Sequence, residues 1–330
     1  MFRKLFNSQQ TGLVIVILLL GVVLTIFAGA HVDRLTGKSV NNFLNSYTLM
    51  QTATDASFFA IMAVGATMVI ISGGVDLSVG STYALAGVTM ALAMRRFDTS
   101  SVGMAAAICV GIGLACGLVN GVMVVGLKVH PFIITLGTMW VLRGIAFVTS
   151  QAESILVPDA LTHAAKASLG LSEALYPVPM LLMLAVTTVG AIFLSRTVPG
   201  RYIYAVGCNV NAAKYSGLNV NWILVAVYVL SGLTAGIAAF IGTSYYGSAS
   251  CGDATGYELY VIASAVVGGA SLSGGKGSAI NAMLGAVLII LIRVAIRQLH
   301  FDQNYEWIII GCAIIIAVVL DQTINRRRLR

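Results

Sequence analysis

Charged side chains are scarce in this sequence of 330 residues, since Asp, Glu, Lys and Arg together make up only 9% of it. A water-soluble domain carries roughly 25% of such residues, so this chain is not built for water. Hydrophobic residues make up 58% and gather in successive runs long enough to cross a bilayer. The runs lack the alternation of an outer-membrane barrel. The composition therefore predicts an all-α, polytopic membrane protein.

Cysteine and histidine are also few, with five and four copies. The cysteines are odd in number and far apart, and no histidines have the close spacing of metal ligands. We therefore expect neither a disulfide framework nor a metal site. No serine occupies a G-x-S-x-G nucleophile motif, which disfavours an intramembrane enzyme.

A phosphate-binding loop is missing as well, although GGASLSGGKGS at residues 268–278 superficially resembles one. The pattern G-x-x-x-x-G-K-S/T needs a glycine where Ala270 stands and a hydroxyl residue where Gly277 stands. An apolar run precedes the segment, in place of the strand that such a loop follows. We therefore expect no catalytic residue and no cofactor in this chain.

Apolar windows bounded by charges or by Gly and Pro clusters predict about ten transmembrane helices. They lie near residues 12–30, 56–72, 81–94, 102–126, 131–149, 178–195, 222–241, 257–270, 278–296 and 306–320. The third and eighth are short, as in tilted, broken or re-entrant segments. The first is longer than the apolar core of a signal peptide, so we expect an uncleaved anchor rather than a cleaved leader.

The basic residues predict the orientation of these spans. Ten spans place both termini on one side, and Lys and Arg are enriched in the inner loops if that side is the cytoplasm. The net charge of +7 is then a topology signal rather than a nucleic-acid surface. We expect one transmembrane domain over residues 1–330, with a cytoplasmic loop at 196–220 and a periplasmic loop at 150–177.

Two glycine-rich segments resemble each other and suggest an internal repeat. Residues 73–80 read GGVDLSVG and residues 268–275 read GGASLSGG, so both fit G-G-x-D/S-L-S-x-G. Gly-interrupted helices in corresponding positions mark substrate sites in many transporters. Chance is the alternative in a chain with 35 glycines. The residues expected at the two helix breaks are Gly73, Gly74, Asp76, Ser78, Gly268, Gly269, Ser271 and Ser273.

Asp76 is the most unusual of these residues, because a carboxylate at membrane depth is costly without partners. One interpretation is structural and makes Asp76 and Ser271 the N-caps of the helices that follow. The other places Asp76 in or beside a translocation path. Arg143, within a predicted span, is a candidate partner for Asp76 or for a carboxylate of an outer loop.

Four stretches carry a resemblance to a known family. They read IMAVGATMVIISGGVDLSVGS (61–81), HPFIITLGTMWVLRGIA (130–146), GRYIYAVGCNVNAAKYSGLNV (200–220) and GYELYVIASAVVGGASLSGGKGS (256–278). Together they resemble the permease subunit of the ribose/xylose/galactose class of bacterial ABC sugar importers. The resemblance implies a bacterial inner-membrane subunit that imports a pentose or hexose sugar and works with a second permease subunit, identical or different. It also implies a cytoplasmic tandem-domain ATPase, which binds ATP and Mg, and a periplasmic or lipid-anchored binding protein.

The same resemblance gives the inner loop a role. Permeases of this class carry an E-A-A-x-x-x-G helix that docks on the ATPase, and residues 211–217 read NAAKYSG with asparagine in place of the glutamate. Small residues permit close docking, and an asparagine caps a helix well. An ordinary surface helix is the alternative. The residues expected to couple this chain to the ATPase are Asn211, Ala212, Ala213, Lys214, Gly217 and Arg201.

A sugar path needs hydroxyl, amide and aromatic side chains within the spans. Suitable candidates are Phe132, Thr135, Thr138, Trp140, Tyr245, Tyr246 and Asn281. Helix packing is the alternative for each. A nucleoside, a polyol or an autoinducer-type furanosyl compound is the alternative cargo. Two alternatives come from other classes of protein: a self-sufficient secondary carrier and a receptor-like binding module. A secondary carrier would leave the loop at 200–220 without a role.

Overall fold

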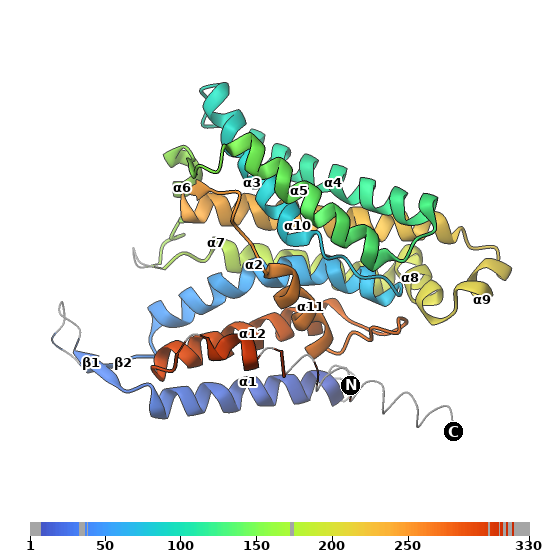
Figure 1. The fold of residues 1–330 in the computed structure, drawn as a ribbon. Helices are drawn as coiled ribbons and strands as arrows, with labels where there is room; N and C mark the ends of the chain where they lie inside the picture. The colour runs from blue at the N-terminus through green and yellow to red at the C-terminus, as the bar shows by residue number, and fades with distance from the viewer. Residues whose placement is uncertain are drawn as a thin grey trace.

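The computed structural model describes residues 8–32, 37, 39–171, 175–302, 304–309, 311, 312, 315 and 319, and it is a bundle of helices (Figure 1). Seven helices in this described part are long and apolar enough to cross a membrane. They are α1 (Ser8–Phe27), α2 (Ser46–Ile71), α4 (Val102–Leu127), α5 (Pro131–Ser150), α7 (Val178–Arg196), α10 (Val220–Tyr246) and α12 (Ala279–Gln298).

The other elements are shorter. They are α3 (Val79–Arg96), α6 (Asp159–Ala165), α8 (Val198–Cys208), α9 (Val210–Tyr215) and α11 (Tyr257–Val267), with the strands β1 (Ala30–Val32), β2 (Ser39–Asn41), β3 (Ile155–Leu156) and β4 (Ser248–Ala249). β1 pairs with β2, and β3 pairs with β4, in both cases antiparallel.

Nine of the ten predicted spans coincide with helices, and the last, near 306–320, falls partly outside the described residues. The two spans predicted to be short are α3, with 18 residues, and α11, with 11. An 11-residue helix is only about 16 Å long and cannot cross the hydrocarbon core alone. The described residues thus contain seven helices that are long and apolar enough to cross a membrane, and the count of ten stays a prediction.

α2 lies at the centre of the bundle, and nearly all of its residues are buried. It packs against α10, α12, α7 and α11, whereas α1 lies at the edge and packs mainly against α12 (Figure 1). Because α2 is apolar on all sides, its sequence is that of a helix surrounded by other helices.

α4 and α10 make the most extensive helix contact. Gly113 and Gly117 of α4 meet Gly232 and Gly236 of α10, and a Cβ atom at Gly113 or Gly232 would overlap the other residue's carbonyl oxygen. Both pairs have the four-residue spacing that brings membrane helices close together. Our sequence analysis missed this contact, although its signal was visible as two G-x-x-x-G motifs.

The two long loops lie at opposite ends of the bundle. The segment at 196–220 forms α8 and α9 at the end where α1 begins, and the segment at 150–177 contributes β3 and α6 at the other end, which is also the end that carries the β1–β2 hairpin (Figure 1). The segment at 150–177 thus contains one short helix, α6.

Candidate functional site

The glycine-rich break between α2 and α3 places Asp76 inside the bundle. α2 ends at Ile71, Gly73 takes a left-handed φ of +87° that favours glycine, and α3 begins at Val79. Asp76 is only 2% exposed and contacts Ser231, the twelfth residue of α10. That position lies about 16 Å along the helix axis, so the carboxylate sits at membrane depth.

Hydroxyl and amide groups surround this carboxylate. Its Oδ1 accepts bonds from the Ser78 backbone N–H at 2.9 Å and from Ser78 Oγ at 2.7 Å, and its Oδ2 accepts from Ser231 Oγ at 2.8 Å. Asn120 of α4 adds an outer layer, because its Nδ2 donates to Ser78 Oγ at 2.7 Å. The cluster joins the break to α4 and α10 through neutral donors.

Two polar atoms near this cluster have no hydrogen-bond partner among the described residues. They are Asn120 Oδ1 and Ser81 Oγ, and both are buried. Buried polar atoms normally have a hydrogen-bond partner, so atoms without one often mark a position that water or a polar ligand occupies. Our sequence analysis missed Asn120 and Ser231, and an asparagine within an apolar run was the available signal for the first.

The predicted N-caps are wrong. The N-cap of α3 is Ser78, and Asp76 instead accepts the Ser78 N–H in the turn before the helix. In the second copy the chain continues as a loop from Ser271 to Ser278, which is the N-cap of α12. Ser271 Oγ bonds to Ser273 Oγ at 2.7 Å inside that loop.

Among the described residues Arg143 makes no hydrogen bond to Asp76, whereas its guanidinium interacts electrostatically with the carboxylates of Asp253 and Glu258 in the segment after α10, so the prediction of a carboxylate partner there is confirmed. Its Nη1 donates to the backbone carbonyls of Cys251 at 2.7 Å and Asp253 at 2.6 Å. The guanidinium therefore holds the segment between α10 and α11 against α5. The sequence could not distinguish carbonyls from carboxylates, because any loop supplies carbonyls.

The two glycine-rich segments share a way of ending a helix. After α2, Gly73 is left-handed and the Gly74 N–H donates to the Val69 carbonyl at 3.0 Å. After α11, Gly269 has a φ of +91° and the Ala270 N–H donates to the Ala265 carbonyl at 2.9 Å. Both are Schellman caps, shifted by one residue relative to the aligned motifs. This common cap accounts physically for the repeated glycines.

The two breaks also meet in space. The Gly275 N–H of the second break donates to the carbonyl of Ile71, the last residue of α2, at 2.8 Å. The contact holds the second break against the end of the central helix.

α8 touches both breaks. Tyr204 donates its hydroxyl proton to the Gly277 carbonyl at 2.9 Å. A Cβ atom at Gly207 would overlap the Ile71 carbonyl and lie 2.7 Å from the Gly275 nitrogen. Only a glycine permits this close approach of three backbones.

α9 forms from the NAAKYSG segment with caps at both ends. Its N-cap is Asn209, whose Oδ1 accepts the Ala212 N–H at 2.9 Å, so the cap expected at Asn211 is wrong by two residues. Gly217, with a φ of +80°, ends the helix, and the Leu218 N–H donates to the Ala213 carbonyl at 3.1 Å. Gly217 therefore ends the helix, and its part in docking stays a prediction.

One face of α9 is free. Ala213 is buried against Val206 and Val220, which fixes the orientation of the helix. Asn211, Ala212 and Lys214 are exposed, as is Arg201 on α8. Tyr215, which our sequence analysis did not select, is 92% exposed, and so large an exposed aromatic side chain marks a contact surface.

The path candidates do not all come together. Thr135 lies at the first break, since its hydroxyl donates to the Val75 carbonyl at 3.2 Å, and Thr138 is buried one turn further along α5. Phe132 and Trp140 are exposed on the outside of α5. Asn281 is buried at the α11–α12 contact, with its Oδ1 unpartnered.

The two tyrosines at the end of α10 lie far along that helix from the break. Tyr245 donates to Gln51 Oε1 at 3.0 Å, and Tyr246 is exposed.

Comparisons with known proteins agree on one kind of molecule. A family profile described as the permease component of the branched-chain amino acid transport system matches residues 48–318. The D-allose transport system permease protein of Escherichia coli K12 is 35% identical over 86% of each chain. The ribose import permease protein of the same strain is 35% identical over 97% of this chain and 95% of its own. The fructose import permease protein of Rhizobium meliloti is 31% identical over 86% of this chain and 80% of its own. No solved structure matches significantly.

Proposed function

The chain belongs to the family of branched-chain amino acid transport system permease components, and we propose that it is the membrane-spanning subunit of an ATP-driven sugar importer. It is a multi-pass protein of the bacterial inner membrane, in the ribose/xylose/galactose class of ABC permeases.

The observation that carries the proposal is the exposed helix α9. The A-A-x-x-x-G segment forms a capped helix at one end of the bundle and presents Tyr215 and Lys214 outward. A cytoplasmic tandem-domain ATPase docks on this face, and Arg201 and Lys214 meet acidic groups of that partner. We infer that α9 and the start of α1 face the cytoplasm, the side on which both termini are expected, and that the β1–β2 hairpin and α6 face the periplasm.

The ATPase then acts on the membrane helices through α8. Movement of the ATPase displaces α8 and α9, and α8 passes the displacement to the two breaks through Tyr204, Gly207 and the end of α2. Because the first break holds Asp76, the polar cluster on α4 and α10 changes its shape in step. Thr135 lies beside this cluster and is placed to meet sugar hydroxyls, whereas Phe132 is not.

This chain supplies no catalytic group in the cycle. ATP and Mg bind to the partner ATPase, and no cofactor is expected here, since the only lysine in a Gly-rich segment of Walker type lacks the required neighbours. A second permease subunit and an extracytoplasmic binding protein complete the importer, with residues 1–330 acting as one permease domain.

The cargo is a sugar. The relatives are named as transporters of D-allose, ribose and fructose, which are all small polyhydroxylated molecules. The neutral donors and acceptors around Asp76 suit such hydroxyls better than an amino acid's paired charges. A nucleoside or an autoinducer-type compound is the less favoured cargo.

The decisive experiment is tagged purification from gently solubilised membranes, followed by reconstitution. We expect an ATPase with tandem Walker motifs to copurify, and labelled ribose or allose to enter proteoliposomes only with ATP and the binding protein. Uptake driven by a sodium or proton gradient, with this chain alone, would establish a secondary carrier instead.

A further inference from the structure

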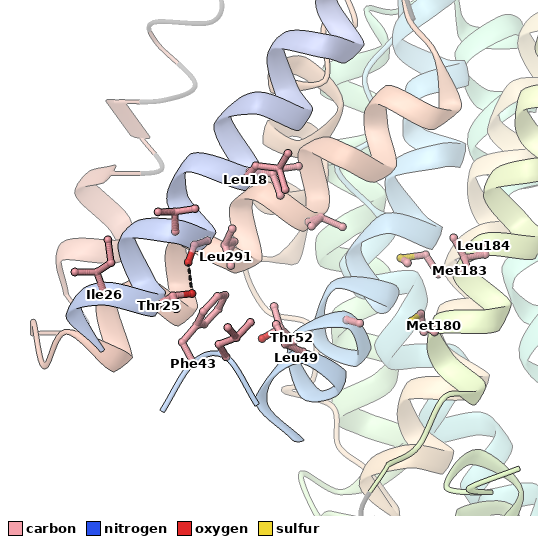
Figure 2. A pocket seen from close by; sticks show the side chains of 16 residues that line it. Leu18, Thr25, Ile26, Phe43, Leu49, Thr52, Met180, Met183, Leu184 and Leu291 are labelled. Atoms are coloured by element: carbon pink, nitrogen blue, oxygen red, sulfur yellow. Dashed lines mark hydrogen bonds between the residues drawn. The ribbon is translucent and has the colours of Figure 1, made fainter. Parts of the chain in front are cut away.

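An apolar cavity of about 640 Å³ lies between α1, α2, α7 and α12. Figure 2 shows Leu18 and Ile26 on the α1 wall, Leu291 on the α12 wall and Leu184 on the α7 wall. Its volume is in the range of small-molecule sites. The cavity exists because α1 packs mainly on α12 and leaves its other side uncovered.

The cavity offers no hydrogen bonds. Its only polar side chains are Thr25 and Thr52, and each hydroxyl donates to a carbonyl of its own helix, Gly21 at 2.8 Å and Thr48 at 2.7 Å. A sugar would lose its bonds to water here without replacement. The ligand must therefore be a hydrocarbon chain.

The cavity occupies one half of the membrane. Its lining comes from the last residues of α1, the first residues of α2 and α7 and the later part of α12. All four are the helix ends that approach the β1–β2 hairpin, opposite α8 and α9 (Figure 1). The occupant thus enters from the leaflet on that side.

A second, polar cavity of about 350 Å³ continues the first toward the membrane surface. The two share Thr52, and Leu291, Val294 and Gln298 follow one face of α12 from the apolar cavity into the polar one. Arg297 lines the polar cavity with its side chain 47% exposed. Asp55 lies 3.6 Å from its Nη2, and the guanidinium has five N–H donors in all.

We propose that the two cavities form one phospholipid site, with an acyl chain in the apolar part and the phosphate at Arg297. An apolar cleft that ends in a guanidinium at the membrane boundary complements such an amphiphile at both ends. The polar end distinguishes this occupant from a neighbouring protein helix, which would bring apolar side chains to both parts.

Native mass spectrometry of the detergent-purified protein tests the site. Gly21→Phe fills the cavity, because a Cβ atom there has only Phe43 Cε1 nearby, at 3.9 Å. Gly12→Phe is the matched control on the same helix, where a Cβ atom has nothing within 4 Å and the cavity is not reached. We expect wild type and Gly12→Phe to retain a phospholipid, and Gly21→Phe to lose it by roughly tenfold or more in occupancy.

Two further variants keep the test decisive if Gly21→Phe disturbs α1. Leu184→Trp fills the cavity from the α7 wall and should lose the same lipid. Arg297→Gln leaves the apolar cavity for the acyl chain unchanged. After delipidation, this variant should bind phosphatidylglycerol roughly fivefold more weakly than wild type and should bind diacylglycerol equally well.

Two outcomes overturn the proposal. One is retention of the wild-type lipid by both cavity-filling variants. The other is a change in the number of chains per complex without loss of lipid, which would make this face an interface with a second copy. No transport is measured, so the result is independent of the proposed importer function.

Discussion

At the scale of single residues, Asp76 explains how this chain tolerates a buried carboxylate. Three hydrogen bonds from Ser78 and Ser231 replace the water that the group loses at membrane depth. A hydrogen bond to a charged group stabilises by roughly 1.5–3 kcal/mol, so the network offsets a substantial part of the burial cost. The same bonds connect the break to α10. Asp76 therefore stabilises the break and also links it to α10.

Replacement of Asp76 tests this dual effect. Asp76→Ala leaves the Ser78 N–H and the Ser231 hydroxyl unpaired, at a cost of about 1–3 kcal/mol for each, and we expect uptake to fall by at least tenfold while the subunits still assemble. Asp76→Asn, which keeps the shape and most of the bonds, should restore the melting temperature. Normal uptake and melting of the alanine variant would reduce Asp76 to a dispensable turn residue.

At the scale of elements, α8 is the link between the exposed helix and the two breaks. Its contacts with Gly277 and with the end of α2 involve backbone atoms, which cannot adapt as side chains do. Gly207 and the Tyr204 hydroxyl thus hold α8 against the end of α2 and against the second break, two segments that are far from α8 in the sequence.

The Tyr204 hydroxyl provides a selective test of this link. Tyr204→Phe removes one hydrogen bond of about 1 kcal/mol, so sugar transported per ATP hydrolysed should fall roughly fivefold. Tyr202→Phe on the same helix is the matched control, because Tyr202 is a partly exposed tyrosine that makes no hydrogen bond to either break. An equal loss of ATP hydrolysis and transport in Tyr204→Phe would contradict a role in coupling.

α9 gives the second prediction at this scale. Tyr215→Asp places a charge on the exposed face without touching the buried side at Ala213, and we expect the amount of copurifying ATPase to fall roughly tenfold. Tyr305→Asp changes an exposed tyrosine beyond α12, near the other end of the bundle, and should have no effect. If the two variants retained the ATPase equally, the docking face would have to lie elsewhere.

At the scale of the whole molecule, the two ends of the bundle carry different structural elements. One end carries α8 and α9, and the other carries the β1–β2 hairpin and α6 (Figure 1). The cavity at Arg297 lies at the second of these ends, beside the last turn of α12. The orientation of the bundle in the membrane therefore decides which partner meets which surface.

Labelling of introduced cysteines checks this orientation. After replacement of the five native cysteines, Lys214→Cys on α9 should react with an impermeant maleimide only when the inner membrane is disrupted. Val32→Cys in the hairpin should react in cells whose outer membrane alone is permeable, because the positive-inside rule places that end outside. The reverse pattern would invert the topology and exclude α9 as the docking site.

Apolar run length determined the class of fold and the approximate positions of nine helices, because bilayer thickness and backbone hydrogen bonding leave few alternatives. Local chemistry also indicated the helix breaks, and the family resemblance indicated the A-A-x-x-x-G helix. The sequence did not determine which carbonyls Arg143 would bind, which asparagine would cap α9, or that Asn120 and Ser231 would meet Asp76. These contacts join residues up to 155 positions apart, and only the packing of α4, α8 and α10 around α2 decides such distances.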